Sequence, residues 1–168
     1  MPDPFVTLGL APSFTLDLAA LEARYRDLAK VVHPDKQGGK SPAERRRALS
    51  LSVDVNAAYR VLRDPIRRAE AMLSARGKSV DRAAPSPAFL MDVMELRETL
   101  ADARAARDLA RVHQLSDEVL ARRERVTTSL AAAFAEARDD DATALVAELK
   151  YLARFLDEVR AIEEEAES

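Results

Sequence analysis

The chain has 168 residues, of which 48% are hydrophobic and 33% are charged, and this is the composition of a folded protein rather than of a disordered one. It contains no cysteine, which excludes disulfide bonds, thiolate chemistry and a cysteine-ligated zinc or iron–sulfur centre within the chain. No apolar run reaches the length of a membrane span, and the first residues lack the basic start and long apolar core of a signal peptide, so we expect a cytoplasmic protein that does not enter a membrane.

The two halves of the chain differ in charge and in helix breakers. Residues 1–78 contain 14 Lys and Arg against 9 Asp and Glu, whereas residues 79–168 contain 12 against 20. All four glycines lie in the first half, and all eight prolines lie at or before Pro87. We therefore expect residues 1–76 and residues 87–168 to form two domains with different partners, joined by a linker over residues 77–86.

The first half begins with two predicted helices. A short helix covers about residues 4–8 and ends at Gly9. A second begins near Asp17, an acceptable N-cap, and ends before Pro34, because a residue that precedes proline is pushed out of the helical region. One apolar stripe at spacings of three and four runs along this second helix; its members are Leu18, Leu21, Tyr25, Leu28 and Val32.

Two further helices follow in the first half. The sequence Ser41-Pro42-Ala43-Glu44 predicts a capping box with proline at the first helical position. Asp64 and Pro65 begin a fourth helix that ends at Gly77. Because a short polar loop joins the second and third helices, we expect them to form an antiparallel hairpin. The stripe of the third helix consists of Ala48, Leu51, Val55, Ala58 and Leu62.

The second half predicts three helices that pack as a bundle. Ser86 and Pro87 begin the first, a weak break follows near Ala105, and the long middle helix runs to about Arg138. Residues 139–141 are three aspartates, which predict a turn and place negative charge at the start of the last helix, where the helix dipole favours it. Narrow apolar seams on all three helices indicate a three-helix bundle, so the whole chain is expected to be all-α. The seams are Phe89, Val93, Leu96 and Leu100; Val112, Val119, Val126, Leu130 and Phe134; and Leu145, Leu149, Leu152, Leu156 and Val159.

The loop between the second and third helices begins with His33-Pro34-Asp35-Lys36. Taken alone, these residues are typical of an ordinary polar turn. Their place at the tip of a helical hairpin, after a helix that carries several cations, resembles the J-domain family. The resemblance extends to Tyr25, Leu28, the segment NAAYRVL at residues 56–62, Asp64, Pro65 and Arg68.

The J-domain resemblance implies that the chain docks on a DnaK-type chaperone and stimulates its ATPase, while the catalytic groups belong to the partner. It assigns chaperone binding to His33, Pro34, Asp35 and Lys36 in the loop and to Arg24, Arg26 and Lys30 in the preceding helix. Because Arg26 and Lys30 are four residues apart, they share one helix face and can steer the chain toward an acidic partner. Pro34 would hold the loop rigid at little entropic cost.

Three positions of the second helix depart from common J-domains, namely Asp27, Val31 and Val32. Asp27 followed by the basic Lys30, together with the segments FLMDVMELRE (residues 89–98), RFLD (residues 154–157) and PIRRAEAML, resembles the HscB branch of the family. That branch implies an HscA-type chaperone and an IscU-type iron–sulfur scaffold protein as partners. It assigns scaffold binding to Leu90, Met91, Met94, Glu95, Glu98 and Phe155.

The residues themselves leave the second surface open. Leu90, Met91 and Met94 lie off the seam of their helix, and Tyr151 and Phe155 lie off the seam of the last helix. Side chains off a seam should be at least partly exposed, and exposed methionines and aromatics often mark a partner surface. Periodicity alone is equally compatible with a wider buried face, and the family resemblance favours the partner surface.

Three alternatives compete with this interpretation. In an enzyme, His33 and Asp35 would form an acid–base pair or ligate a metal, but the only other histidine, His113, lies in the other half and no phosphate-binding loop or paired-histidine motif is present, so we expect no catalytic residue, metal or cofactor. In a nucleic-acid binder, Lys40 and Arg45–Arg47 would contact phosphates, but no aromatic platform accompanies them, and a solvated helix face is favoured. A generic J-domain protein would share the first half and differ only in its client.

Overall fold

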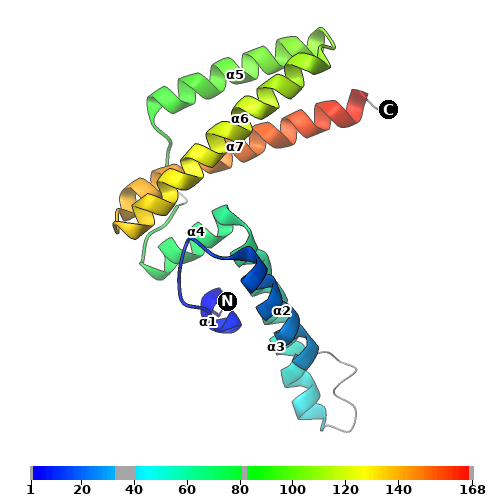
Figure 1. Cartoon of the computed structure of the whole chain (residues 1–168), viewed down its shortest axis with the longest axis vertical. Coiled ribbons are helices and arrows are strands. Elements are labelled where there is room, and N and C mark those ends of the chain that lie inside the picture. The colour runs from blue at the N-terminus through cyan, green and yellow to red at the C-terminus, as the bar shows by residue number, and fades with distance from the viewer. Residues whose placement is uncertain (1, 33–40, 81–82, 167–168) are drawn as a thin grey trace. The chain divides into compact units, whose positions relative to one another are not determined.

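The computed structural model describes residues 2–32, 41–80 and 83–166, and these residues form helices without strands. In chain order the helices are α1 (Pro4–Leu8), α2 (Leu18–Val32), α3 (Pro42–Arg63), α4 (Pro65–Ala75), α5 (Pro87–Ala105), α6 (Leu109–Ala135) and α7 (Asp139–Ala166) (Figure 1). The chain divides into two compact units, residues 1–77 and residues 78–168. The prediction of an all-α fold is therefore confirmed for the described residues.

The first unit is built on the antiparallel pair α2 and α3, with α1 packed against both of them (Figure 1). The rings of Tyr25 and Tyr59 stack at 4.2 Å between centroids, and the Tyr25 hydroxyl donates to Oδ1 of Asn56 at 2.8 Å. These contacts join the middle of α2 to the second half of α3. The buried apolar side chains of this unit are Phe5, Leu8, Phe14, Leu21, Val32, Val55, Ala58, Leu62, Ala69, Met72 and Leu73.

Side-chain caps begin the helices where the sequence predicts them. The Ser41 hydroxyl accepts from the Glu44 amide while the Glu44 carboxylate accepts from the Ser41 amide, so the capping box is confirmed. Asp64 accepts from the amide of Arg67 at 2.9 Å, and Ser86 accepts from the amide of Phe89 at 3.2 Å. These bonds satisfy amides that a helix N-terminus leaves without an intrahelical partner.

Arg68 is the charged residue that the described part of the chain buries. Its Nη1 donates to the carbonyl oxygen of Phe14 at 2.7 Å, and its guanidinium lies 5.5 Å from the centroid of the Phe14 ring. Burial lowers the pKa of Arg68, and the nearby Asp64 carboxylate opposes that change. The side chain therefore fastens the segment between α1 and α2 to α4.

The predicted stripes of the first unit are too long at one end. Leu21, Val32, Val55, Ala58 and Leu62 are buried. Leu18 and Leu51, which the stripes also include, are exposed, so their assignment to the core is wrong. A repeat of three and four identifies the face that a helix buries, but it does not say how far along the helix a neighbour covers that face.

Gly9 ends α1 in the left-handed region with φ 63°, and its position is tied to Arg24. A Cβ at Gly9 would lie 2.9 Å from Nη2 of Arg24, whose Nε donates to the carbonyl oxygen of Leu8 at 3.0 Å. Gly9→Ala is therefore expected to destabilise the first unit by about 2 kcal/mol, through backbone strain and the displaced guanidinium.

Gly77→Ala is a matched control for that substitution. Gly77 has φ 74°, but a Cβ there would meet no atom within 4 Å. Only backbone strain should then lower the stability of Gly77→Ala, by about 1 kcal/mol. Amide hydrogen exchange in α1–α4 measures the stability of the first unit in both variants, independently of the stability of the second unit. If both variants lose the same stability, the contact with Arg24 makes no contribution at Gly9.

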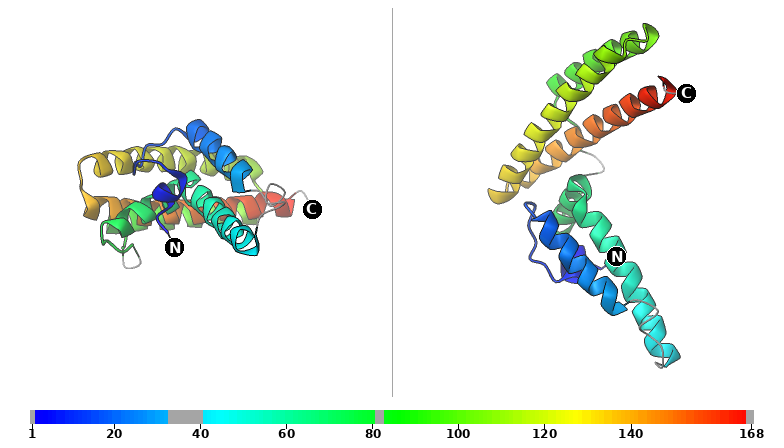
Figure 2. Two further views of the ribbon diagram at one scale, coloured as in Figure 1. Left: turned by 90° about the horizontal axis from the view of Figure 1, so that it is seen from below. Right: turned by 45° about the vertical axis from the view of Figure 1, so that its right-hand side comes forward.

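The second unit is a three-helix bundle in which α6 and α7 run side by side over most of their lengths and α5 packs against both (Figure 2). The predicted seam of α6 is buried throughout, at Val112, Val119, Val126, Leu130 and Phe134. Both corners place a non-glycine residue in the left-handed region, Arg107 with φ 54° and Ala137 with φ 55°. The three aspartates predicted to form a turn instead make up the first turn of α7.

The buried face of α7 is wider than the predicted seam. Leu145 and Leu156 of that seam are only half-buried, whereas Val146, Phe155 and Ile162 outside it are buried. Because α7 contacts both α5 and α6, two flanks of the helix are covered instead of one. No helix within the described residues is long and apolar enough to cross a membrane.

Candidate functional site

The tripeptide predicted to bind a chaperone, with the lysine that follows it, lies outside the described residues; these are His33, Pro34, Asp35 and Lys36. The structure describes the helix that leads to them. Arg26 and Lys30, which we call the α2 basic face, are both exposed on that helix. Their predicted placement on the surface is therefore confirmed.

Each cation of the α2 basic face has a carboxylate neighbour on the same helix. Arg26 pairs with Glu22, and Nζ of Lys30 lies 3.9 Å from Oδ1 of Asp27. Such exposed pairs contribute at most about 1 kcal/mol, so a partner carboxylate can replace the intrahelical one at little cost. The arrangement suits ion pairs at the rim of an interface rather than a deep charged pocket.

Arg24 differs from the other two predicted cations because its side chain is used within the first unit. Its Nε donates to the carbonyl oxygen of Leu8, which is the last residue of α1. A cation at a helix C-terminus satisfies a free carbonyl and interacts favourably with the helix dipole. Arg24 thus holds α1 on α2, and its assignment to chaperone binding stays a prediction.

The second candidate surface lies on α5 and contains two exposed methionines. Met91 is 65% exposed and Met94 is 63% exposed. Singly exposed apolar side chains are common, but these two are three residues apart on one side of α5, and grouped apolar side chains often mark a partner surface. Glu95 and Glu98 are also exposed, and their spacing places them on the same side of α5. Leu90 is half-buried at the edge of this group. We call these five residues the α5 docking face.

Phe155, the sixth residue predicted for scaffold binding, is buried. Its side chain is 1% exposed and is one of the largest fully buried side chains of the described residues. The expectation that it is at least partly exposed is therefore wrong. The cause is the wide buried face of α7, which the single predicted seam did not include. Tyr151, one turn earlier, is half-buried, with its ring edge-on to Phe89 at 6.4 Å between centroids.

Under the α5 docking face lies a contact that sequence patterns did not reveal. Arg122 of α6 donates from Nη2 to Oδ2 of Asp92 at 2.8 Å, and its guanidinium lies 4.6 Å from the centroid of the Phe89 ring. In the sequence, Arg122 belongs to the polar run ARRER, which is typical of a solvated helix surface. Arg122 lies three residues after Val119 and four before Val126, so the seam spacing places it beside the buried face of α6, as it does Arg123 but not Arg125.

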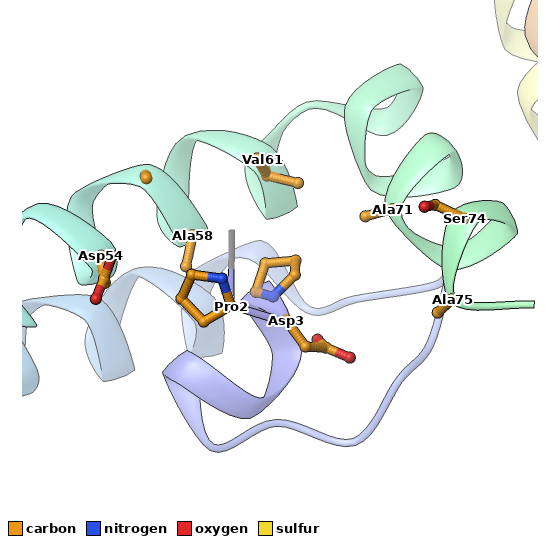
Figure 3. A pocket seen from close by; sticks show the side chains of 10 residues that line it. Pro2, Asp3, Asp54, Ala58, Val61, Ala71, Ser74 and Ala75 are labelled. Carbon is orange, nitrogen blue, oxygen red and sulfur yellow. The ribbon is translucent and has the colours of Figure 1, made fainter. Parts of the chain in front are cut away.

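The first unit also contains a hollow of about 390 Å³ that none of the predicted site residues lines. Figure 3 shows small side chains of α3 and α4 around it, facing the N-terminal segment. The Asp3 carboxylate at its edge accepts from the amides of Phe5 and Val6 and so caps α1. The residues around the hollow are Pro2, Asp3, Pro4, Asp54, Ala57, Ala58, Val61, Ala71, Ser74 and Ala75.

Comparison with known proteins finds two family matches, one in each half of the chain. Residues 3–71 match the DnaJ domain family, and residues 85–160 match the family described as the HSCB C-terminal oligomerisation domain. The chain is 39% identical over 167 residues to a protein of Shewanella oneidensis named co-chaperone protein HscB homolog, covering 95% of this chain and 96% of that one.

Solved structures give the same comparison in three dimensions. Chaperone HscB from Vibrio cholerae superposes with a TM-score of 0.88 at 32% identity, covering 98% of this chain and 99% of that one. Human co-chaperone protein HscB superposes with a TM-score of 0.88 at 25% identity, covering 97% of this chain and 83% of that one. The likeness therefore extends over both units and is not confined to the first.

Proposed function

Because the chain belongs to the HscB family of J-domain co-chaperones, we propose that it stimulates the ATPase of an HscA-type chaperone of the Hsp70 class and delivers an IscU-type iron–sulfur scaffold protein to it. The observation that carries the proposal is the separation of two candidate surfaces into two compact units. The tripeptide at residues 33–35 follows the α2 basic face in one unit, and the α5 docking face lies in the other.

The chaperone step in this proposal is a conformational one. The hydrolytic groups belong to the partner, and the co-chaperone acts by binding one conformation of that partner more tightly than the other. Rim cations such as Arg26 and Lys30 accelerate the encounter, because opposite charges steer association. The contacts that discriminate between the two conformations are assigned to His33 and Asp35, with Pro34 limiting the entropy lost on binding.

The delivery step is assigned to the α5 docking face. Methionine side chains are flexible and polarisable, so Met91 and Met94 can fit an apolar partner surface of irregular shape. Glu95 and Glu98 beside them would select a partner with cations around that apolar surface. Holding the scaffold and the chaperone on one chain makes their meeting intramolecular and raises their effective concentration, which is the physical content of delivery. We place this activity in the cytoplasm.

The nearest alternative is a J-domain co-chaperone with a different client. It would use the same tripeptide, so chaperone assays alone do not separate the two proposals. The large exposure of Met91 and Met94 shows that the second unit offers an apolar surface, and the family favours the scaffold protein as the molecule that covers it.

The proposal is tested with purified chain, an HscA-type chaperone and an IscU-type scaffold protein. We expect the chain to raise the steady-state ATP hydrolysis rate of the chaperone, and the scaffold to be captured by the chain in a pull-down without the chaperone. Stimulation without capture would favour the generic co-chaperone. Capture without stimulation would contradict the assigned role of residues 33–35.

A further inference from the structure

Arg122 is less exposed than the other arginines that join helices of the second unit. Its side chain is 25% exposed, whereas that of Arg104, which joins α5 to α7, is 57% exposed. A cation in such a partly desolvated position is usually held by specific contacts. The hydrogen bond and the ring contact of Arg122 are both made with the first turns of α5.

A single guanidinium holds two residues of α5 that are one turn apart. The guanidinium carbon of Arg122 lies over the Phe89 ring, and Nη2 donates to the Asp92 carboxylate. The cation–π contact and the charge-assisted hydrogen bond constrain different directions. Tyr151 of α7 lies edge-on to the Phe89 ring, so the ring has contacts on both α6 and α7. Together these contacts fix how the beginning of α5 is rotated about its axis.

The same turns of α5 carry the exposed methionines on the side away from Arg122. Met91 follows Phe89 by two residues, which is about 200° around a helix. Met94 follows Asp92 by two residues and is displaced in the same way. A rotation of this end of α5 would therefore move both methionines together.

The charge of Arg122 also acts on a carboxylate of α7, that of Glu148. Burial raises the pKa of Glu148, and the positive charge of Arg122 opposes that rise. The charge of Arg122 thus acts on a carboxylate of α7 as well as on the Asp92 carboxylate of α5 that it contacts. Neutralising it would leave Asp92 without this partner and Glu148 without its compensating charge.

We propose that Arg122 is a positioning residue for the α5 docking face, which it holds in its binding orientation through Phe89 and Asp92. The inference rests on the proposed scaffold binding and deepens it, because it adds a residue of α6 that the partner need not touch. Preorganisation of this kind raises affinity by removing the cost of ordering the surface on binding.

Arg122→Met is the principal test, because methionine keeps the aliphatic bulk and removes both contacts. We expect its affinity for an IscU-type scaffold protein to fall about tenfold, measured by isothermal titration calorimetry. Arg122→Lys keeps the charge and should recover part of the loss. Arg104→Met is the matched control, because it removes an ion pair at 2.7 Å between α5 and α7 near the end of α5 that lies away from the docking face, and its affinity should stay unchanged.

A double-mutant cycle separates positioning from a merely structural role. Once Met91 and Met94 are replaced by alanine, the orientation of the face matters little, so Arg122→Met should weaken the remaining binding less than twofold. Hydrogen exchange at amides 90–94 should accelerate in Arg122→Met, with α7 unchanged. The inference would be overturned if Arg122→Met bound the scaffold as tightly as the wild type, or lost the same affinity with and without Met91 and Met94. Scaffold binding by the wild type would still uphold the proposed function in either case. No scaffold binding by the wild type would overturn both.

Discussion

Replacing His33 by glutamine is expected to reduce stimulation of the chaperone ATPase to near the basal rate. Glutamine has a similar length and can form hydrogen bonds, but it lacks the imidazole ring and its geometry. Specific contacts made by a few residues at the centre of an interface commonly account for most of its binding energy, and the family resemblance assigns such contacts to this residue. Steady-state ATP hydrolysis by an HscA-type chaperone, titrated with wild type and variant, measures the effect.

His113→Gln is the matched control for that experiment. His113 is the other histidine of the chain; it lies on α6 in the second unit, and its Nε2 lies 3.3 Å from Oε1 of Glu163. The substitution is chemically identical, so any general effect of losing an imidazole appears in both variants. Full stimulation is expected for His113→Gln and unchanged scaffold binding for His33→Gln. Stimulation by His33→Gln equal to that of the wild type would contradict the assigned role of the tripeptide.

The helices of this chain were predictable because short-range chemistry determines where they begin and end. Ser41 and Glu44 satisfy each other's amides, Gly9 takes the left-handed conformation that other residues avoid, and Pro87 occupies a first helical position where its missing amide costs nothing. These signals depend on three or four neighbouring residues. They are therefore visible in the sequence before any tertiary contact is known.

The corner between α6 and α7 shows where such signals are weaker. A left-handed residue ends α6, but it is Ala137 rather than glycine, so the sequence contains no strong breaker there. The predicted end of α6 at about Arg138 is close to the observed end at Ala135 because the aspartates that follow favour a helix start. The start signal of the next helix thus located the corner, although Ala137 itself gives no sign in the sequence that α6 ends there.

The exposed residues of the α5 docking face were predicted more accurately than the residues packed behind them. Met91 and Met94 are exposed, as expected for residues off a seam, because neither α6 nor α7 covers that side of α5. The prediction for Phe155 was wrong because α7 packs extensively along α6 and also contacts α5, so its buried face is wider than one seam. Arg122 was missed for a related reason, since a charged residue shows its buried contacts only once its partners on another helix are known.

Replacing Met91 and Met94 together by alanine is expected to weaken scaffold binding about 100-fold and to leave the fold intact. Both side chains are mostly exposed in the free chain, so their removal creates no internal cavity and costs little stability. At an interface the same side chains would be covered, and losing two such anchors corresponds to about 3 kcal/mol of binding free energy. Calorimetric titration with an IscU-type scaffold measures the affinity, and circular dichroism measures the helical content.

Phe155→Ala is the substitution that distinguishes docking from packing in that experiment. Because the Phe155 ring is buried, its removal should leave a cavity in the bundle and lower the free energy of unfolding by about 3–5 kcal/mol. The methionine variant should instead unfold within about 0.5 kcal/mol of the wild type. The methionine variant should therefore lose affinity for the scaffold and keep its stability, whereas Phe155→Ala should lose stability. A Met91→Ala, Met94→Ala variant that binds the scaffold as tightly as the wild type would remove the α5 docking face from the proposed function, and an unaffected stability of Phe155→Ala would show that its ring is not part of the core.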